Sequence, residues 1–324
     1  MAKPKITIVG LGLIGNSIGL GLTTGQRDFE VVGHDKESDA AGVAKKLKAV
    51  DKTDWNLISA CDGADLVVLA LPVQAIHDTL QALAGELKPG CVVMDTASIK
   101  VPVLHWAETL LPDNVGFVGT NPIVSAEETG GNAARTDIFE NATWAICASP
   151  STSPEAVKMA SNLAERLGAN PLYLEPEEHD GMLAAVEHLP SVVSMALLSS
   201  AVSMPSWREM RKLAGGQFES STRLVSEDPS VFSDAALANR ENLARWIDTF
   251  IDNMQGWRDL IAAGDEEALA AAFDSALDER VRWQKERRTG HWDEGHPAMP
   301  PKRNMLMEML GLGRLVGRKP KDQS

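Results

Sequence analysis

The stretch KITIVGLGLIGNSIGLGLTTG, residues 5–25, joins a short apolar run to a segment with helical spacing through a glycine-rich turn. Gly10, Gly12 and Gly15 form the pattern G-x-G-x-x-G. The first glycine permits a tight turn, the second lets a ligand approach the backbone, and the third lets the helix pack closely on the strand. The pattern therefore predicts a strand, a turn and a helix whose N-terminus can bind phosphate groups.

Asp35 ends the next strand-like run, FEVVGHD (29–35), about twenty positions after Gly15. An acid at this place binds ribose hydroxyls of a dinucleotide and repels a 2′-phosphate. We therefore predict NAD as the cofactor, with NADP kept possible by the neighbouring Lys36. The alternative is a structural glycine turn followed by a solvated aspartate. The predicted cofactor-binding residues are Gly10, Gly12, Leu13, Ile14, Gly15, Asp35 and Pro72.

Strand-like and helix-like segments alternate through the first 175 residues. The strand-like runs are 5–10, 29–35, 65–72, 90–98, 115–120 and 143–149, and the helical segments between them include 39–48, 74–87 and 101–110. Continuous apolar strands separated by helices predict a parallel sheet covered on both faces. The fold class that this predicts is an α/β, Rossmann-like parallel-sheet domain.

The pattern changes near residue 175, where strand-like runs stop and long helical patterns begin. We predict a dinucleotide-binding domain over 1–175 and an all-α domain over 176–290. The remaining 291–324 are rich in proline and polar residues, and end in a Met/Leu segment with basic residues. A flexible tail is the favoured interpretation, and a docking or membrane-surface helix is the alternative.

The composition excludes several classes of partner. Of the 324 residues, 44% are hydrophobic and 23% charged, which is ordinary for a globular protein, while the net charge of −14 would repel nucleic acid and anionic membranes. The three cysteines, Cys61, Cys91 and Cys147, have no metal-ligand spacing, so we expect no metal site and a reduced, cytoplasmic setting.

One apolar stretch, 182–202, is long but carries Glu187, His188 and Pro190 near its start. Charged and helix-breaking residues are costly in a bilayer, so we do not expect it to span a membrane. Their presence at the start of a buried helix instead raises the question of a functional site.

In doubly wound sheets, ligands bind beyond the carboxyl ends of the strands. Ser98, in DTASIK, follows such an end and could offer its hydroxyl near a nicotinamide, or cap the helix that follows. Lys100 could attract an anion, although simple solvation is the favoured interpretation. Another strand end is GTNPIVSAEETGG, residues 119–131, which contains Asn121.

Five segments in order resemble the prephenate/arogenate dehydrogenases of tyrosine biosynthesis, over residues 5–290. They are GLGLIGNSIGLGL, DTASIK, NPIVSAEETGGNAARTDIFENATW, EEHDGMLAAVEHLPSVVSMAL and FESSTRLVSEDPSVFSDAALANRENL. The resemblance implies a Rossmann domain followed by a helical domain that forms a homodimer. It also implies oxidation of a small cyclohexadienyl carboxylate at C4, with hydride passed to NAD(P) and the ring carboxylate lost as CO2.

The resemblance assigns roles to individual residues. His188 matches the first histidine of the family's Ser-His-Leu-Pro-His motif, which helps hold the substrate, and Arg223 matches an arginine that grips a substrate carboxylate. The alternatives are a core histidine and a surface ion pair. Gly216 and Ser125 are further predicted substrate-binding residues.

The departures from the family pattern bear on the substrate. Asn121 stands where the family has the histidine that accepts the proton of the 4-hydroxyl group, and Ser191 stands at the second histidine of the helix motif. Ala126 replaces a threonine, Glu187 a serine, and an expected Arg-Asp pair is Glu219-Ser220. A neutral amide cannot take a proton near pH 7, so general-base help is lost or moved.

The sequence therefore predicts a prephenate dehydrogenase-like enzyme. Asn121 would contact the C4 substituent, Ser98 would orient substrate and nicotinamide, and His188 and Arg223 would bind the substrate. Three hypotheses stay open: an enzyme for prephenate or arogenate, a dehydrogenase for a related ring such as 4-amino-4-deoxyprephenate, and a catalytically weakened cofactor-binding regulatory dimer.

Overall fold

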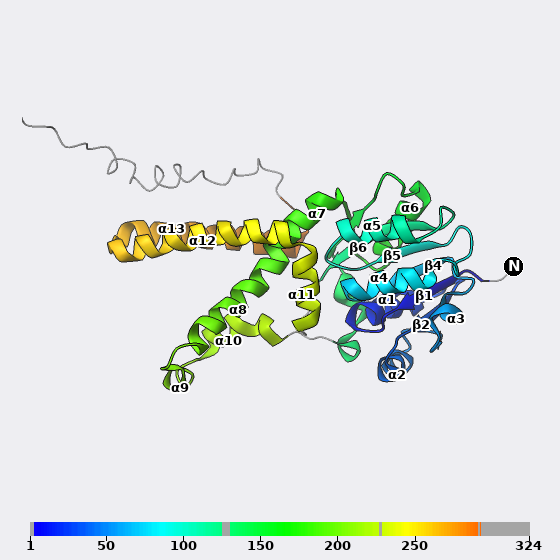
Figure 1. Ribbon diagram of the computed structural model, residues 1–324, viewed down its shortest axis with the longest axis horizontal. Coiled ribbons are helices and arrows are strands. Elements are labelled where there is room, and N and C mark those ends of the chain that lie inside the picture. Colours follow the sequence, from blue (N-terminus) through cyan, green and yellow to red (C-terminus); the bar gives the residue numbers. More distant parts are fainter. Residues whose placement is uncertain (1–2, 125–129, 227–228, 291, 293–324) are drawn as a thin grey trace, which may run out of the picture. The chain divides into compact units, whose positions relative to one another are not determined.

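An eight-stranded sheet forms the framework of the N-terminal part of the chain (Figure 1). The computed structural model describes residues 3–124, 130–226, 229–290 and 292. In spatial order the strands are β3-β2-β1-β4-β5-β6-β7-β8. Their bounds are β1 Lys5–Val9, β2 Glu30–His34, β3 Lys52–Thr53, β4 Leu66–Leu69, β5 Val92–Asp95, β6 Gly116–Ile123, β7 Thr143–Cys147 and β8 Asn170–Tyr173.

The sheet is not wholly parallel. Strand β7 runs antiparallel to β6, with Asn121 opposite Ala145, whereas every other neighbouring pair is parallel. The short strand β3 and the strand β8 were absent from the sequence-based prediction, because two residues and a mostly exposed run carry little apolar signal. The Rossmann-like, predominantly parallel sheet is confirmed.

Helices cover both faces of the sheet. Their bounds in this region are α1 Leu13–Thr23, α2 Ser38–Leu47, α3 Leu57–Cys61, α4 Val73–Leu83, α5 Val101–Leu110 and α6 Pro154–Arg166. Alternate strand residues enter two separate cores: Ile8 and Val68 pack with α1 and α6, while Val9 and Val67 pack with α3, α4 and α5. This two-sided burial explains why the strands read as continuous apolar runs.

After β8 the described part of the chain is mainly helical. The helices are α7 Pro176–Leu183, α8 Leu189–Val202, α9 Trp207–Met210, α10 Gly216–Thr222, α11 Pro229–Ala238, α12 Arg240–Ala263 and α13 Glu266–Thr289. A π-helical segment, Ala184–His188, joins α7 to α8 and ends two residues before Pro190. A π-helical turn widens the helix locally and is frequent at functional sites, so the Glu-His-Leu-Pro sequence marks an irregularity within one continuous helical run.

The chain divides into two compact units between Asp248 and Thr249. The second unit contains the end of α12 and all of α13, where the rings of Trp257 and Phe273 lie 5.1 Å apart. Asp265 caps α13 by accepting a hydrogen bond from Ala268 N at 3.0 Å. Apart from residue 292, the predicted tail over 291–324 lies outside the described residues.

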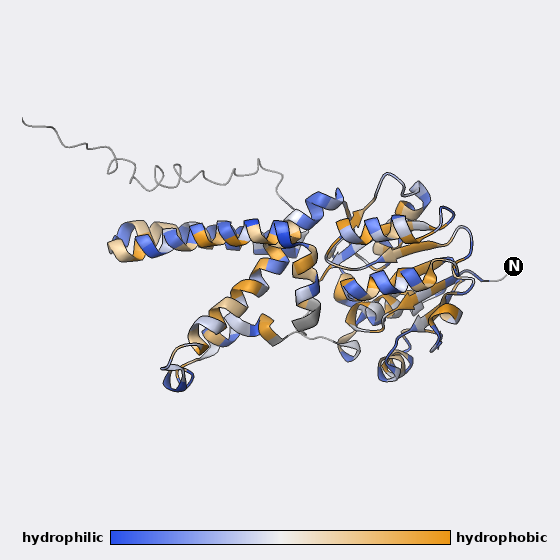
Figure 2. Ribbon diagram, in the orientation of Figure 1, coloured by the Kyte–Doolittle hydropathy of each residue, from blue (hydrophilic) through white to orange (hydrophobic). Residues whose placement is uncertain are grey.

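The helical run Pro176–Val202 is the single described helix whose length and composition match a membrane span. Its most apolar window has a mean hydropathy of 1.5, and 22% of that window is buried. Figure 2 shows hydrophobic residues along α8. Helices that pack within or between subunits have the same composition. The apolar, largely unburied run Pro176–Val202 therefore indicates a surface that packs against another part of the protein or another subunit.

Candidate functional site

The glycine-rich turn has the geometry that its pattern predicts. Gly10 has φ +94°, and a Cβ there would lie 2.2 Å from Ala70 O. A Cβ on Gly15 would lie 1.9 Å from Gly10 O, whereas a Cβ on Gly12 would meet nothing within 4 Å. Gly10 and Gly15 are therefore required by the fold itself, while Gly12 keeps open the space in front of α1.

The N-terminus of α1 is free to bind an anion. Gly12 is its N-cap and has no side-chain hydrogen bond, and its first turn, which includes Leu13 and Ile14, carries no acidic residue. Uncapped N–H groups and the helix dipole favour a phosphate at this position. The open space at Gly12 and this uncapped terminus fit the pyrophosphate of a dinucleotide.

Asp35 lies at the end of β2 beside this turn. Its carboxylate accepts hydrogen bonds from Leu11 N at 2.7 Å and Glu37 N at 2.8 Å. These bonds hold the carboxylate against the glycine-rich turn, and each oxygen retains a lone pair for another donor. Pro72, the N-cap of α4, follows the neighbouring strand β4 at the same edge of the sheet.

The end of β5 contains a buried ion pair. Lys100 Nζ contacts the Asp95 carboxylate and donates to Thr120 O at 2.7 Å, and both charged side chains are fully buried. Burial raises the pKa of Asp95, and the Lys100 charge opposes that rise. The expectation that Lys100 is solvated was wrong, because its side chain ties β5 to β6 inside the protein.

Asp180, from α7, caps α5 across 80 positions of sequence. Its carboxylate accepts from Lys100 N at 2.7 Å and from Val101 N at 2.9 Å, the first N–H groups of the helix. An anion at this position is stabilised by the helix N-terminus. Helix capping, one of the two roles considered for Ser98, therefore belongs to Asp180.

The side-chain amide of Asn121 contacts the ring of His179. Asn121 lies on β6 with 5% of its surface exposed, and its Nδ2 is 3.2 Å from Nε2 of the fully buried His179. The other ring nitrogen, Nδ1, is 2.9 Å from the Asp180 carboxylate. Strand β6, helix α7 and the start of α5 thus meet in one hydrogen-bonded cluster.

His188 lies in a second branch of the same cluster. Its Nε2 is 3.4 Å from Ser98 Oγ, and its Nδ1 is 3.4 Å from Asn239 Nδ2. Asn239 Nδ2 also donates to Asp180 O at 2.7 Å, which fixes the amide. The structure therefore brings together Ser98, Asn121 and His188, which lie far apart in the sequence.

Burial lowers the pKa of His188, with Asp180 opposing this effect and His179 adding to it. The imidazole is therefore neutral near pH 7. Its partner at Nδ1 is an amide N–H donor, so the hydrogen of the neutral ring lies on Nε2, on the side of Ser98. At Nε2 the neutral His188 therefore donates a hydrogen bond and has no lone pair with which to take a proton.

The remaining predicted substrate residues have no hydrogen bond to the cluster around Asp180 among the described contacts. Arg223 is exposed at the end of α10, which is tied to α8 by the bond from Ser194 Oγ to Ser221 O at 2.6 Å. Gly216 begins α10 and borders a hollow lined by Trp207 and other apolar residues. Ser125 lies outside the described residues.

Comparisons with known proteins show the family of the chain. The family model for the prephenate dehydrogenase nucleotide-binding domain matches residues 18–173, and the model for the prephenate dehydrogenase dimerization domain matches residues 175–275. The chain belongs to the prephenate dehydrogenase family. It is an oxidoreductase family, and the chain is a dehydrogenase with a nucleotide-binding domain.

Three similar proteins place the chain within this family. Prephenate dehydrogenase of Bacillus subtilis is 29% identical, over 86% of this chain and 76% of the relative. The solved prephenate dehydrogenase of A. aeolicus, in complex with hydroxyphenyl propionate and NAD+, superposes with TM-score 0.79 at 25% identity, covering 87% of this chain and 98% of that chain. The more distant 4-amino-4-deoxyprephenate dehydrogenase of Streptomyces pristinaespiralis is 24% identical, over 72% of this chain and 76% of the relative.

The sequence-based prediction missed His179, Asp180 and Asn239. All three lie within segments that resemble the family, but nothing in their spacing indicates that they meet. His179 and Asp180 look like polar residues on the first turns of an ordinary amphipathic helix. Their partners lie 58 to 80 positions away, so the fold alone brings them together.

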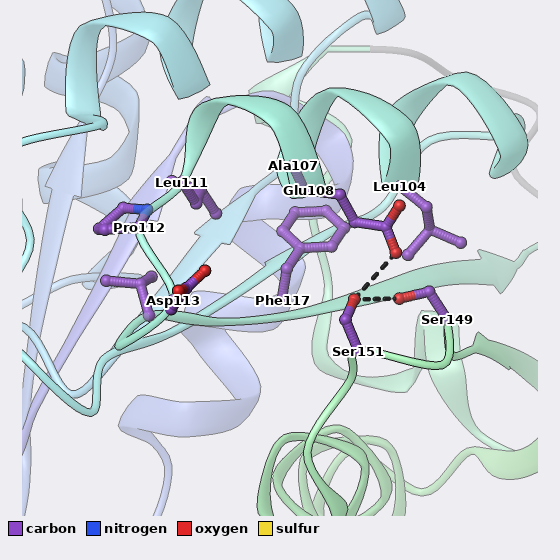
Figure 3. A pocket seen from close by; sticks show the side chains of 10 residues that line it. Leu104, Ala107, Glu108, Leu111, Pro112, Asp113, Phe117, Ser149 and Ser151 are labelled. Carbon is purple, nitrogen blue, oxygen red and sulfur yellow. Dashed lines mark hydrogen bonds between the residues drawn. The ribbon is translucent and has the colours of Figure 1, made fainter.

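A separate cavity lies at the other end of α5 (Figure 3). It has a volume of about 360 Å³ and is bordered by Phe117 and Glu108, whose carboxylate accepts from Ser151 Oγ at 2.9 Å. The hydroxyls of Ser149 and Ser151 lower the pKa of Glu108. Helix α5 begins at the cluster around Asp180 and ends at this cavity, so the cavity is not part of the candidate active site.

Proposed function

We propose that this prephenate dehydrogenase family member catalyses the NAD(P)-dependent oxidative decarboxylation of a prephenate-like cyclohexadienyl carboxylate. The observation that carries the proposal is the cluster of Ser98, Asn121 and His188 at the carboxyl edge of a sheet that also carries the glycine-rich turn. In the reaction, hydride leaves C4, CO2 leaves the opposite ring carbon, and the ring becomes aromatic. A bound nicotinamide dinucleotide would accept the hydride.

The side chains of the site would orient the substrate against the nicotinamide and bind its polar groups. Ser98 would align the substrate with the nicotinamide, and His188, neutral and with its hydrogen on Nε2, would donate to the substrate. Arg223 would bind a substrate carboxylate through its two-pronged guanidinium, joined by Gly216 and Ser125. Asn121 would contact the C4 substituent as a neutral group.

For the cofactor, we infer a preference for NAD over NADP. Asp35 supports this, because a carboxylate fixed beside the glycine-rich turn accepts from ribose hydroxyls and repels a 2′-phosphate. Gly10, Gly12, Leu13, Ile14 and Gly15 would form the pyrophosphate site, with Pro72 at the neighbouring strand end.

For assembly, the proposal is a homodimer built mainly from residues 177–290. Helix α8 supports it, because Leu197 and Val202 are more than two-fifths exposed in one chain. Large exposed apolar surfaces favour association. Light scattering should report a dimer at micromolar concentration, and a monomer would refute this part of the proposal.

The domain division at residue 175 and a cytoplasmic location are further parts of the proposal. Cys61, Cys91 and Cys147 are buried and unbonded, and burial raises the pKa of Cys61 to about 12, which suits a reducing compartment.

A second candidate substrate is 4-amino-4-deoxyprephenate. The amide of Asn121 and the Nε2–H of His188 favour it, since neither group removes a proton from a 4-hydroxyl. The test is NAD(P)H formation from prephenate, arogenate and the 4-amino compound. Turnover of one or more supports the proposal, whereas no turnover of any would support a regulatory cofactor-binding dimer.

A further inference from the structure

The side-chain amide of Asn121 can present either its oxygen or its nitrogen to a ligand, and its buried neighbours decide which. Asp180 accepts two backbone N–H bonds from the start of α5, so it acts as a carboxylate fixed in position. His179 Nδ1 lies 2.9 Å from that carboxylate and must donate to it. An imidazole with one hydrogen that donates from Nδ1 has its lone pair at Nε2.

A lone pair at Nε2 demands a donor, and Asn121 Nδ2 lies 3.2 Å from it. The amide nitrogen is thus directed to His179, and Oδ1 is directed away. Among the described residues no group donates to Asn121 Oδ1, and this oxygen is not sealed from solvent, although the residue as a whole is 5% exposed.

The geometry points to His179 as a positioning residue that, anchored by Asp180, turns the Asn121 amide so that its oxygen faces the C4 substituent of the substrate. This inference rests on the proposed function. It specifies the substrate as a ring whose C4 substituent is a hydrogen-bond donor, and it makes residue 121 an acceptor that takes no proton.

The first test needs no substrate. In the full-length protein with ¹⁵N-labelled histidine, NMR should show His179 with its hydrogen on Nδ1 and a bare Nε2. In protein labelled with ¹⁵N at asparagine, the Asn121 side-chain amide signal should shift in His179→Gln. A hydrogen on Nε2 of His179 at neutral pH would overturn the inference, whatever the activity of the protein.

The second test is a double-mutant cycle on kcat/KM with the substrate that the parent oxidises best. His179→Ala should lower kcat/KM about tenfold in the parent and leave it unchanged in Asn121→Ala, because it acts through that amide. Equal losses in both backgrounds would show a merely structural role and overturn the inference.

The conservative variant His179→Gln covers the case in which His179→Ala does not fold. Glutamine can accept from Asn121 and donate to Asp180, so His179→Gln should keep most of the activity. A folded His179→Gln protein whose kcat/KM falls tenfold or more would overturn the inference. Inactivity of the parent on all three ring substrates would instead count against the proposed function, while the NMR result still decides the role of His179.

Discussion

The glycine-rich turn after β1 and the cluster behind Asn121 lie at the same edge of the sheet but prepare for a ligand in different ways. The turn uses backbone: Gly10 and Gly15 make the close approaches possible, and the N–H groups of α1 face the ligand. The cluster uses side chains, with Asn121 fixed by His179 and His179 fixed by Asp180. Backbone N–H groups stay in place when neighbouring side chains are replaced. In the cluster, by contrast, the position of each side chain depends on the next one, so replacing any of them disturbs the others.

The glycines give the largest expected effect and a matched pair. Gly15→Ala places a Cβ against Gly10 O, so the free energy of unfolding should fall by about 3 kcal/mol or more. Gly12→Ala meets nothing, so its stability should change by less than about 1 kcal/mol while dinucleotide affinity falls. Thermal unfolding and cofactor titration measure both. Equal destabilisation by the two variants would contradict the division of roles between these glycines.

On the substrate side, Arg223 provides the next largest effect. Loss of a charged hydrogen bond to a substrate carboxylate costs about 2–5 kcal/mol, so Arg223→Ala should raise KM strongly and leave the unfolding temperature unchanged. Arg223→Lys keeps the charge but not the two-pronged geometry, so its KM should lie between those of the parent and Arg223→Ala. An unchanged KM in the alanine variant would place Arg223 outside the site.

A smaller effect is expected at Asp35. Fluorescence titration should show tighter binding of NAD than of NADP, by about tenfold or more, because the carboxylate repels a 2′-phosphate. Asp35→Asn keeps an acceptor for Leu11 N but removes the charge, so the difference between NAD and NADP affinity should become smaller. NADP binding as tight as NAD binding in the parent would show that Lys36 and its neighbours dominate.

The smallest effect concerns the pH dependence of stability. The pKa of His188 is lowered from 6.5 by burial, so below about pH 6.5 the unfolded chain binds a proton that the folded protein resists. The free energy of unfolding should therefore decrease as the pH falls below that value. His188→Gln should lessen this decrease, because glutamine does not bind a proton in this range. An identical pH dependence in the two proteins would mean that His188 titrates normally.

The same contrast explains what the sequence could predict. The glycine-rich turn, the parallel strands and Asp35 follow from local spacing, since backbone conformation and two-sided burial leave a periodic signal. Strand β7 gives the same apolar signal whichever way it runs, so its antiparallel direction was not visible. The burial of Lys100 and the link from His179 to Asn121 depend on contacts across 20 to 80 positions, which local patterns do not record.

The resemblance to the family located Ser98, Asn121 and His188, and the structure brings them into one cluster. It did not indicate Asp180 as the cap of α5 or Asn239 as the partner of His188, because those roles exist only once α7 and the neighbouring helices have packed. The functional roles of these residues remain predictions that mutagenesis can test.

The most direct test of the central claim is NADH formation from prephenate, arogenate and 4-amino-4-deoxyprephenate by the parent and by Asn121→His. We expect the parent to oxidise at least one of these rings with release of CO2. We also expect the histidine variant to be about tenfold or more faster on a 4-hydroxy ring, with a pH profile set by a group titrating near neutrality. If Asn121→His is no faster than the parent on the 4-hydroxy rings, and the parent oxidises the 4-amino ring, the protein acts on the amino substrate. A parent that forms NADH from none of the three would contradict the account.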